Sequence, residues 1–295
     1  MKTLLSLMTA ISLAIFGTSL YYKPPHLEEI DQWDGENYRE NALLQEGWAN
    51  KFFFQKYSFA GDEYVLDIGS GDGKLTARIA QGVPGGYVMG IDKSDSMLDV
   101  ARRERGDVEN LDFVFQDADD ASFYQKFPEK FDLVVSFTVL HWIKNQLNVL
   151  RGIREVLRPG GTFYIRICSK GGDPIQNLAD EMYKSSTYQS HFTHFVDPMT
   201  RFSPEEYRYL LKKAHLHLVY LKDVEEQDQI MGKEKLIKQL KSWLPHYHYL
   251  KNQEKEALAE SFMEDLVERY LALYPPKADQ TIILYDHYLE VIGRK

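Results

Sequence analysis

The stretch Val65–Lys74, VLDIGSGDGK, decides the fold of this chain. A short apolar run ends in Asp67, and three glycines follow at alternate positions, Gly69, Gly71 and Gly73. The apolar run predicts a buried strand. Glycine permits positive φ angles and lets the backbone approach a ligand closely. We therefore expect a strand, a tight ligand-binding turn and a helix, in that order.

Apolar runs alternate with segments of helical composition downstream of this motif. The expected strands are Tyr64–Ile68, Tyr87–Asp92, Asp112–Asp117, Phe131–Phe137 and Thr162–Ile167. Strands that alternate with helices predict right-handed crossovers and a parallel sheet that helices cover on both faces.

The regular alternation of strand and helix patterns ends after Gly171. We expect a sixth strand at His217–Leu221 and a last strand at Tyr285–Ile292, with amphipathic helices between them. Residues 222–279 are therefore expected to be a helical insertion before the last strand and not a separate domain. The predicted fold class is α/β, with a Rossmann-like sheet of seven mostly parallel strands.

The composition narrows the class of protein. The chain has 295 residues, of which 44% are hydrophobic, and a formal net charge of −9. This balance is typical of a globular protein, and an acidic chain is a poor candidate for a nucleic-acid partner. Cys168 is the one cysteine, so an intrachain disulfide and a zinc ribbon are excluded. His191 and His194 lack an evident third ligand, so we expect no metal.

The glycine turn matches neither of the two common phosphate-binding motifs. In the dinucleotide pattern G-x-G-x-x-G the third glycine would stand where Lys74 is. In a P-loop the first glycine would stand at Ile68, and a serine or threonine would replace Leu75. The expected ligand is therefore a nucleoside without phosphate.

S-adenosylmethionine is such a nucleoside, and its sulfonium cation suits an acidic site. Asp67, Asp92 and Asp117 each stand at the end of an expected strand. The carboxyl ends of parallel strands meet at one edge of the sheet, where open α/β sheets bind ligands. Asp92 could accept both ribose hydroxyls, and Asp117 could accept from the adenine amino group.

The order of these motifs resembles the class I S-adenosylmethionine-dependent methyltransferases. The glycine turn, Asp92 and Asp117 are followed by Phe131-Asp132 and by Arg158–Gly161, RPGG. The similarity runs from about Tyr38 to Lys170 and continues more loosely to the C-terminus. The segment Val134–Gln146, VVSFTVLHWIKNQ, is similar to small-molecule carboxyl O-methyltransferases, in particular juvenile hormone acid and trans-aconitate methyltransferases.

This resemblance implies roles for individual residues. Gln45, within a helix at Asn37–Ala49 that closes over the cofactor, and Trp142 would hold an acceptor carboxylate near the methyl group. Ser136 would lie near the methionine end of the cofactor. The expected cofactor site comprises Asp67, Gly69, Ser70, Gly71, Gly73, Asp92, Lys93, Asp117, Ala118 and Ser136.

The acceptor class decides whether a base is needed. A carboxylic acid is already ionised at neutral pH, so direct displacement needs only alignment and desolvation. A hydroxyl or carbon acid would need a base, for which His141 is the candidate. Arg201 is a candidate carboxylate clamp, and His246–Tyr249 could line the acceptor pocket. C- or N-methylation of a lipid or quinone-like acceptor, and a non-catalytic protein that binds S-adenosylmethionine, stay open.

The N-terminus has a separate character. Residues 4–20, LLSLMTAISLAIFGTSL, form an uncharged apolar run that resembles a signal peptide or membrane anchor. An apolar helix packed on the protein is the alternative. We set residues 1–25 apart as leader and linker and expect the methyltransferase domain over residues 26–295. Because the cofactor is cytosolic, we expect this domain in the cytoplasm, with membrane association through residues 4–20 left open.

Overall fold

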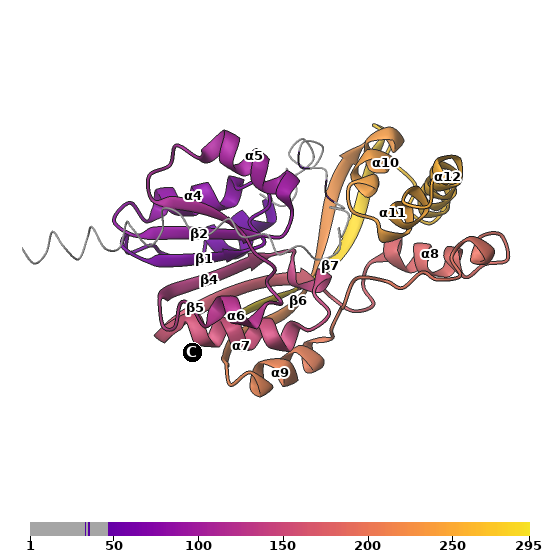
Figure 1. The fold of residues 1–295 in the computed structure, drawn as a ribbon. Coiled ribbons are helices and arrows are strands. Elements are labelled where there is room, and N and C mark those ends of the chain that lie inside the picture. The colour runs from indigo at the N-terminus through magenta and orange to yellow at the C-terminus, as the bar shows by residue number, and fades with distance from the viewer. Residues whose placement is uncertain (1–32, 34, 36–46) are drawn as a thin grey trace, which may run out of the picture. The chain divides into compact units, whose positions relative to one another are not determined.

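The computed structural model describes Trp33, Gly35 and residues 47–295. In this part of the chain seven strands form one sheet in the order β3-β2-β1-β4-β5-β7-β6 (Figure 1). Strands β1 to β5 are parallel to their neighbours, whereas β7 is antiparallel to both β5 and β6. The strands are β1 Tyr64–Ile68, β2 Tyr87–Asp92, β3 Leu111–Phe115, β4 Phe131–Phe137, β5 Leu157–Cys168, β6 His217–Met231 and β7 Thr281–Arg294. The expected fold class is confirmed.

Helices cover both faces of the sheet, each over its own apolar core (Figure 1). One face carries α4 (Lys74–Gly82) and α5 (Asp95–Arg105), and the other carries α6 (Ala121–Tyr124), α7 (Gln146–Val156) and α9 (Pro204–Lys213). Both faces of the parallel strands are therefore buried, which explains why these strands are continuous apolar runs.

The helix starts follow the capping rules. The Ser94 side chain accepts the Met97 N–H at the start of α5. At the start of α9, Ser203 and Glu206 form a reciprocal capping box, and Pro204 occupies the first turn. These local signals are readable in the sequence and place two helices whose apolar faces then dock on the sheet.

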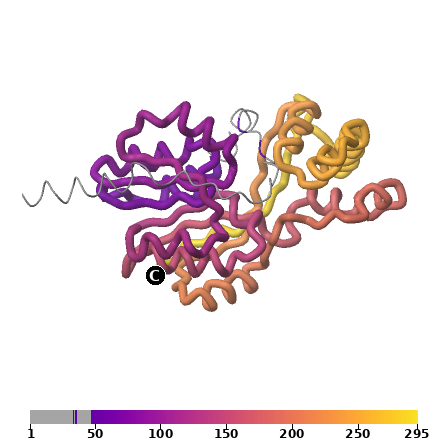
Figure 2. The backbone as a smooth tube through the Cα atoms, in the orientation of Figure 1, coloured from indigo at the N-terminus to yellow at the C-terminus, as the bar shows by residue number. Residues whose placement is uncertain are grey.

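The long pair β6–β7 extends beyond β5 and carries a second group of helices (Figure 2). We call the group formed by the ends of β6 and β7 and these helices the arm. Its helices are α8 (Pro174–Tyr183), α10 (Lys233–Lys241), α11 (Pro245–Lys251) and α12 (Glu256–Leu273). The arm has an apolar core of its own, to which Ile230, Ile282 and Leu284 contribute from the strands.

The helices of the expected insertion begin at Lys233 and not at Lys222, because residues 222–231 continue strand β6. The polar sequence of this segment conceals the strand. Glu226 is buried in spite of its charge, and its carboxylate lies 3.5 Å from Arg166 Nη2. Arg166, 1% exposed, also pairs with Glu290 of β7 at 2.8 Å. A buried ion pair therefore replaces the apolar contacts from which a strand is usually predicted.

The sequence predictions for the N-terminal region lie outside the described residues. This applies to the apolar leader, to Gln45 and to all but the last three residues of the helix expected at Asn37–Ala49. Among the residues that are described, no helix combines the length and apolarity needed to cross a membrane.

Candidate functional site

A cavity of about 1050 Å³ lies at the carboxyl ends of β1, β2 and β3. Eight of the residues expected to bind a cofactor line it: Asp67, Gly69, Ser70, Gly71, Asp92, Lys93, Asp117 and Ala118. We call it the cofactor cavity. The expected crevice at the tips of the strands is therefore present, and residues from three strand ends meet there.

The glycine turn forms one wall because only glycine fits its backbone. Gly69 and Gly73 have φ angles of 79° and 75°. A Cβ atom on Gly69 would lie 2.2 Å from Val139 Cγ2. Gly73 is the N-cap of α4 and does not line the cavity; a Cβ there would meet the ring of Phe113 at 2.4 Å. The turn thus needs positive φ and close packing at the same positions.

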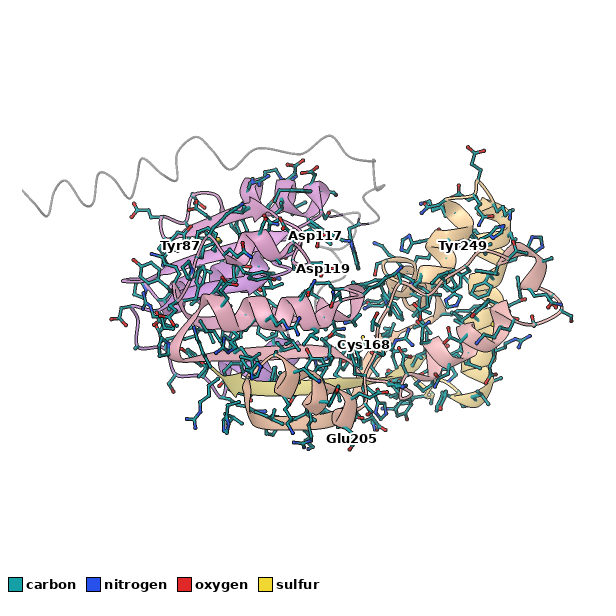
Figure 3. The ribbon with its side chains drawn as sticks, turned by 60° about the horizontal axis from the view of Figure 1, so that its bottom comes forward. Tyr87, Asp117, Asp119, Cys168, Glu205 and Tyr249 are labelled. Atoms are coloured by element: carbon teal, nitrogen blue, oxygen red, sulfur yellow. The ribbon has the colours of Figure 1, made fainter. Side chains whose placement is uncertain are left out.

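Asp92 fastens the turn to the end of β2. Its Oδ2 accepts the Gly71 N–H and its Oδ1 accepts the Ser94 N–H, both at 2.9 Å. In the loop after β3, Asp117 Oδ1 accepts the Asp119 N–H at 2.9 Å. Figure 3 shows Asp117 and Asp119 close together on this loop. Backbone N–H groups therefore orient the carboxylates of Asp92 and Asp117.

Asp67 is the most deeply buried carboxylate of the cavity wall, at 3% exposed. Burial raises the pKa of Asp67 to about 7, and the nearby Asp92 charge raises it further. The Thr76 hydroxyl donates to Asp67 Oδ2 at 2.7 Å and lowers this pKa. A buried carboxylate without a cationic partner is costly. A positively charged ligand in this cavity would therefore stabilise the ionised form of Asp67.

Besides Gly73, two more of the described residues expected at the site, Ser136 and His141, do not line the cofactor cavity. Ser136 is fully buried, and its hydroxyl donates to the Ile68 carbonyl at 2.9 Å, so it holds β4 to the end of β1. His141 is 3% exposed, and its Nε2 lies 3.6 Å from Cys168 Sγ. Burial, with a smaller contribution from Arg201, lowers the pKa of His141 to about 3. His141 is therefore a neutral interior residue beside β5.

Other residues of the cofactor cavity were not predicted from the sequence. They are Trp33, Asp72, Lys74, Leu75, Ile91, Met97, Gln116, Phe137, Thr138, Val139, Trp142 and Ile143, of which Trp142 was expected only as an acceptor residue. Several directly follow predicted strands, so their proximity to a strand end was an available signal. No such signal marked Trp33, because this residue lies well before the first predicted strand and follows no predicted strand end.

A smaller cavity adjoins the first and shares two of its residues, Trp33 and Trp142. We call it the aromatic cavity. Its other described lining residues, Trp243, Pro245 and His248, come from the arm. The Trp33 and Trp142 rings meet edge to face with centroids 5.3 Å apart. Of the part of the chain that is described, no acidic residue, lysine or arginine lines this cavity.

Arg201 and His246 have other surroundings. Arg201 Nη2 lies 3.1 Å from Asp197 Oδ2, so its charge already has a partner. His246 is buried in the arm with its Nε2 3.4 Å from Asp180 Oδ1. Within the described ranges, no group of three or more His, Cys, Asp or Glu side chains could hold a metal ion.

Comparison with known proteins identifies the class. Residues 60–254 match the family model described as a methyltransferase domain. The match covers more than half of the chain, so the chain belongs to this family, and the expected class of S-adenosylmethionine-dependent methyltransferases is confirmed.

Two relatives illustrate the range of the family. A protein of Invertebrate iridescent virus 6 named as a methyltransferase is 28% identical over 61% of this chain and 65% of its own length. The ubiquinone/menaquinone biosynthesis C-methyltransferase UbiE of Ectopseudomonas mendocina is 34% identical over 52% of this chain and 58% of its own length. The chain thus matches less than two thirds of either relative.

A solved structure shows the same fold. Phosphoethanolamine N-methyltransferase 2 of Haemonchus contortus, in complex with phosphomonomethylethanolamine and S-adenosylhomocysteine, has a TM-score of 0.54 and 18% sequence identity. The similarity covers 91% of this chain and 58% of that chain. The resemblance to juvenile hormone acid and trans-aconitate methyltransferases stays a prediction.

Proposed function

We propose that this protein transfers a methyl group from S-adenosylmethionine to a small-molecule acceptor. The observation that carries the proposal is the cofactor cavity, which has carboxylates at three strand ends and a glycine turn. It shares two tryptophans with a second cavity that has aromatic walls. When bound, S-adenosylmethionine supplies an electrophilic methyl group on a cationic sulfur. No motif for phosphate binding competes with this assignment.

The proposed cofactor residues are assigned to different parts of S-adenosylmethionine. Asp92 would accept from the ribose hydroxyls, while Asp117 and Ala118 would border the adenine. Asp67 would place negative charge in the wall of a site for a cation, and Lys93 and Ser70 would complete the border. The glycine turn would let the backbone contact the nucleoside closely.

The acceptor is proposed in two forms. O-methylation of a carboxylic acid is supported by the resemblance of Val134–Gln146 to carboxyl methyltransferases, and it needs no base. Trp142 lines both cavities, and its indole N–H could donate to one oxygen of such an acceptor. Gln45, the proposed partner of Trp142, lies outside the described residues.

An uncharged acceptor of the phenol or quinol type is the second candidate. The described lining of the aromatic cavity offers no cation for a carboxylate, and Arg201 is already paired with Asp197. The relative UbiE is named as a C-methyltransferase of quinone biosynthesis, which supports an acceptor of this kind.

Titration calorimetry with S-adenosylmethionine and S-adenosylhomocysteine tests the cofactor assignment, and binding of both is expected. Transfer of a labelled methyl group into paired aliphatic acids and phenols then identifies the acceptor class. Absence of binding for both nucleosides would refute the proposed function as a whole.

The location of the protein is part of the proposal. Since the methyl donor is cytosolic, the catalytic domain is proposed to be cytoplasmic, with residues 4–20 as a membrane-associating or cleaved leader. Fractionation of a tagged protein, together with the mass of its mature N-terminus, distinguishes these forms.

A further inference from the structure

Helix α11 presents two histidines to two different environments. Leu250, and Tyr247 on a neighbouring turn, are buried in the core of the arm and fix the orientation of the helix. His246 is buried beside Asp180, among aromatic rings of the arm. His248, two residues later, is half-buried and lines the aromatic cavity. The fold therefore aims one histidine at the space next to the cofactor cavity.

The protonation state of His248 suits a proton acceptor. Burial lowers the pKa of His248 below the usual value of 6.5, and the nearby Lys251 charge lowers it further. The Ser242 backbone raises this pKa, but the net shift is downward. The imidazole is therefore neutral at pH 7. A neutral imidazole has one ring nitrogen that carries a lone pair and can accept a proton.

His141, the base expected from the sequence, does not compete for this role. It lines neither cavity, and its ring lies against Cys168 in the interior. Of the described histidines, His248 is the one that lines the cofactor cavity or the aromatic cavity.

We propose that His248 is the base of the methyl transfer and that the aromatic cavity takes an uncharged phenol or hydroquinone. This inference rests on the proposed function. The aromatic walls of Trp142 and Trp243 suit a planar ring. An acceptor without charge needs no counterion, and the described residues of the lining offer none. A phenol has a pKa near 10, so at neutral pH its hydroxyl has to lose a proton as it reacts.

The step balances as follows for a phenol. The O–H proton passes to the free ring nitrogen of His248, which becomes an imidazolium. The oxygen electron pair forms the new O–CH₃ bond. The pair of the broken C–S bond stays on the donor sulfur, which becomes a neutral thioether. The positive charge thus moves from sulfur to His248, and water takes the proton after the product leaves.

The test compares two acceptors of matched shape, 4-ethylphenol and 4-ethylbenzoic acid, in wild type and in His248→Gln. Glutamine keeps a polar amide at this position but cannot act as a base. We expect kcat for the phenol to fall at least about 100-fold, the lower range for loss of a general base. His194→Gln, at an exposed position of the described chain, is the matched control and should leave kcat unchanged.

Two further readouts separate a base from a structural role. The rate of the Gln variant on the phenol should rise with pH toward the pKa of the phenol, whereas wild type should reach a plateau once His248 is neutral. Three of the four tryptophans line the aromatic cavity, so phenol binding should quench tryptophan fluorescence. The quenching should be equal in wild type and in His248→Gln. His248→Ala should regain rate when imidazole is added.

The outcomes are distinct. Equal phenol rates in wild type and His248→Gln, methylation of the benzoic acid alone, or no fluorescence change with the phenol would each overturn the inference. So would a failure of imidazole to rescue His248→Ala while its cofactor affinity is intact. If wild type binds no S-adenosylmethionine, the proposed function itself fails.

Discussion

The cofactor cavity and the aromatic cavity share two tryptophans but are built in opposite ways. The cofactor cavity takes most of its wall from strand ends and the turns directly after them. The aromatic cavity joins Trp33, the loop at Trp142 and the arm residues Trp243, Pro245 and His248. A site made by the backbone of one motif leaves a local sequence signature, whereas a site assembled from distant segments leaves none.

We expect the largest loss of stability from a substitution at Arg166, on the part of the sheet next to the arm. Arg166→Met removes the buried cation that Glu226 and Glu290 share. Of the described residues, only the exposed lysines Lys51 and Lys56 then remain as their cationic partners. Removal of one partner from a buried ion pair costs about 3–5 kcal/mol of unfolding free energy. Urea unfolding measures this loss. Arg158→Met, which breaks a partly exposed pair with Asp132, should cost no more than about 1 kcal/mol. Equal losses would show that burial of the Arg166 group is unimportant.

Substitution of Asp92 should affect the cofactor cavity alone. Asp92→Ala removes the acceptor for the Gly71 and Ser94 N–H groups and the proposed partner of the ribose. We expect S-adenosylmethionine affinity to fall about 100-fold, since two or more hydrogen bonds to a charged group are lost. Calorimetry gives the affinity, and quenching by 4-ethylphenol should be unchanged. A variant that binds cofactor normally would contradict the assignment.

Trp243 should show the reverse pattern. Trp243→Ala opens one wall of the aromatic cavity. A lost aromatic contact in a ligand pocket costs about 1–3 kcal/mol, so the acceptor KM should rise roughly 10-fold to 100-fold. Cofactor affinity should stay within twofold of wild type. If cofactor affinity fell instead, the two cavities would not be separable.

A pH dependence is expected from Asp67, and close to neutral pH it should be small. Its pKa is raised to about 7, so ionisation is disfavoured in the folded protein, and stability is lost as pH rises from about 4 to 7. A cationic ligand prefers the ionised form, so S-adenosylmethionine affinity should rise with pH through 7, by up to about tenfold per pH unit below it. Asp67→Asn should remove this slope, and a slope that survives would exclude Asp67 as its source.

Local patterns carried most of the fold prediction. Glycines at 69, 71 and 73 after an apolar run indicated the turn, and continuous apolar runs indicated strands buried on both faces. The segment 222–231 was mistaken for the start of the insertion, because its charged residues fit a sheet only when Arg166 is placed opposite them. That pairing joins residues far apart in the chain.

Strand position alone does not tell where a side chain points. Ser136 follows the expected strand pattern, yet its hydroxyl bonds to the Ile68 carbonyl and does not face a cavity. His141 has the residue type of a base but lies in the interior. His248, within a run expected to line the acceptor pocket but not proposed as a base, lines the aromatic cavity.

The sequence by itself determined the sheet, the glycine turn and the acidic strand ends, because these depend on residues close together in the chain. Only the tertiary structure decided which histidine and which tryptophans border the second cavity. Their proximity arises from the way β6 and β7 carry the arm toward the carboxyl edge of the sheet, and no local spacing encodes that approach.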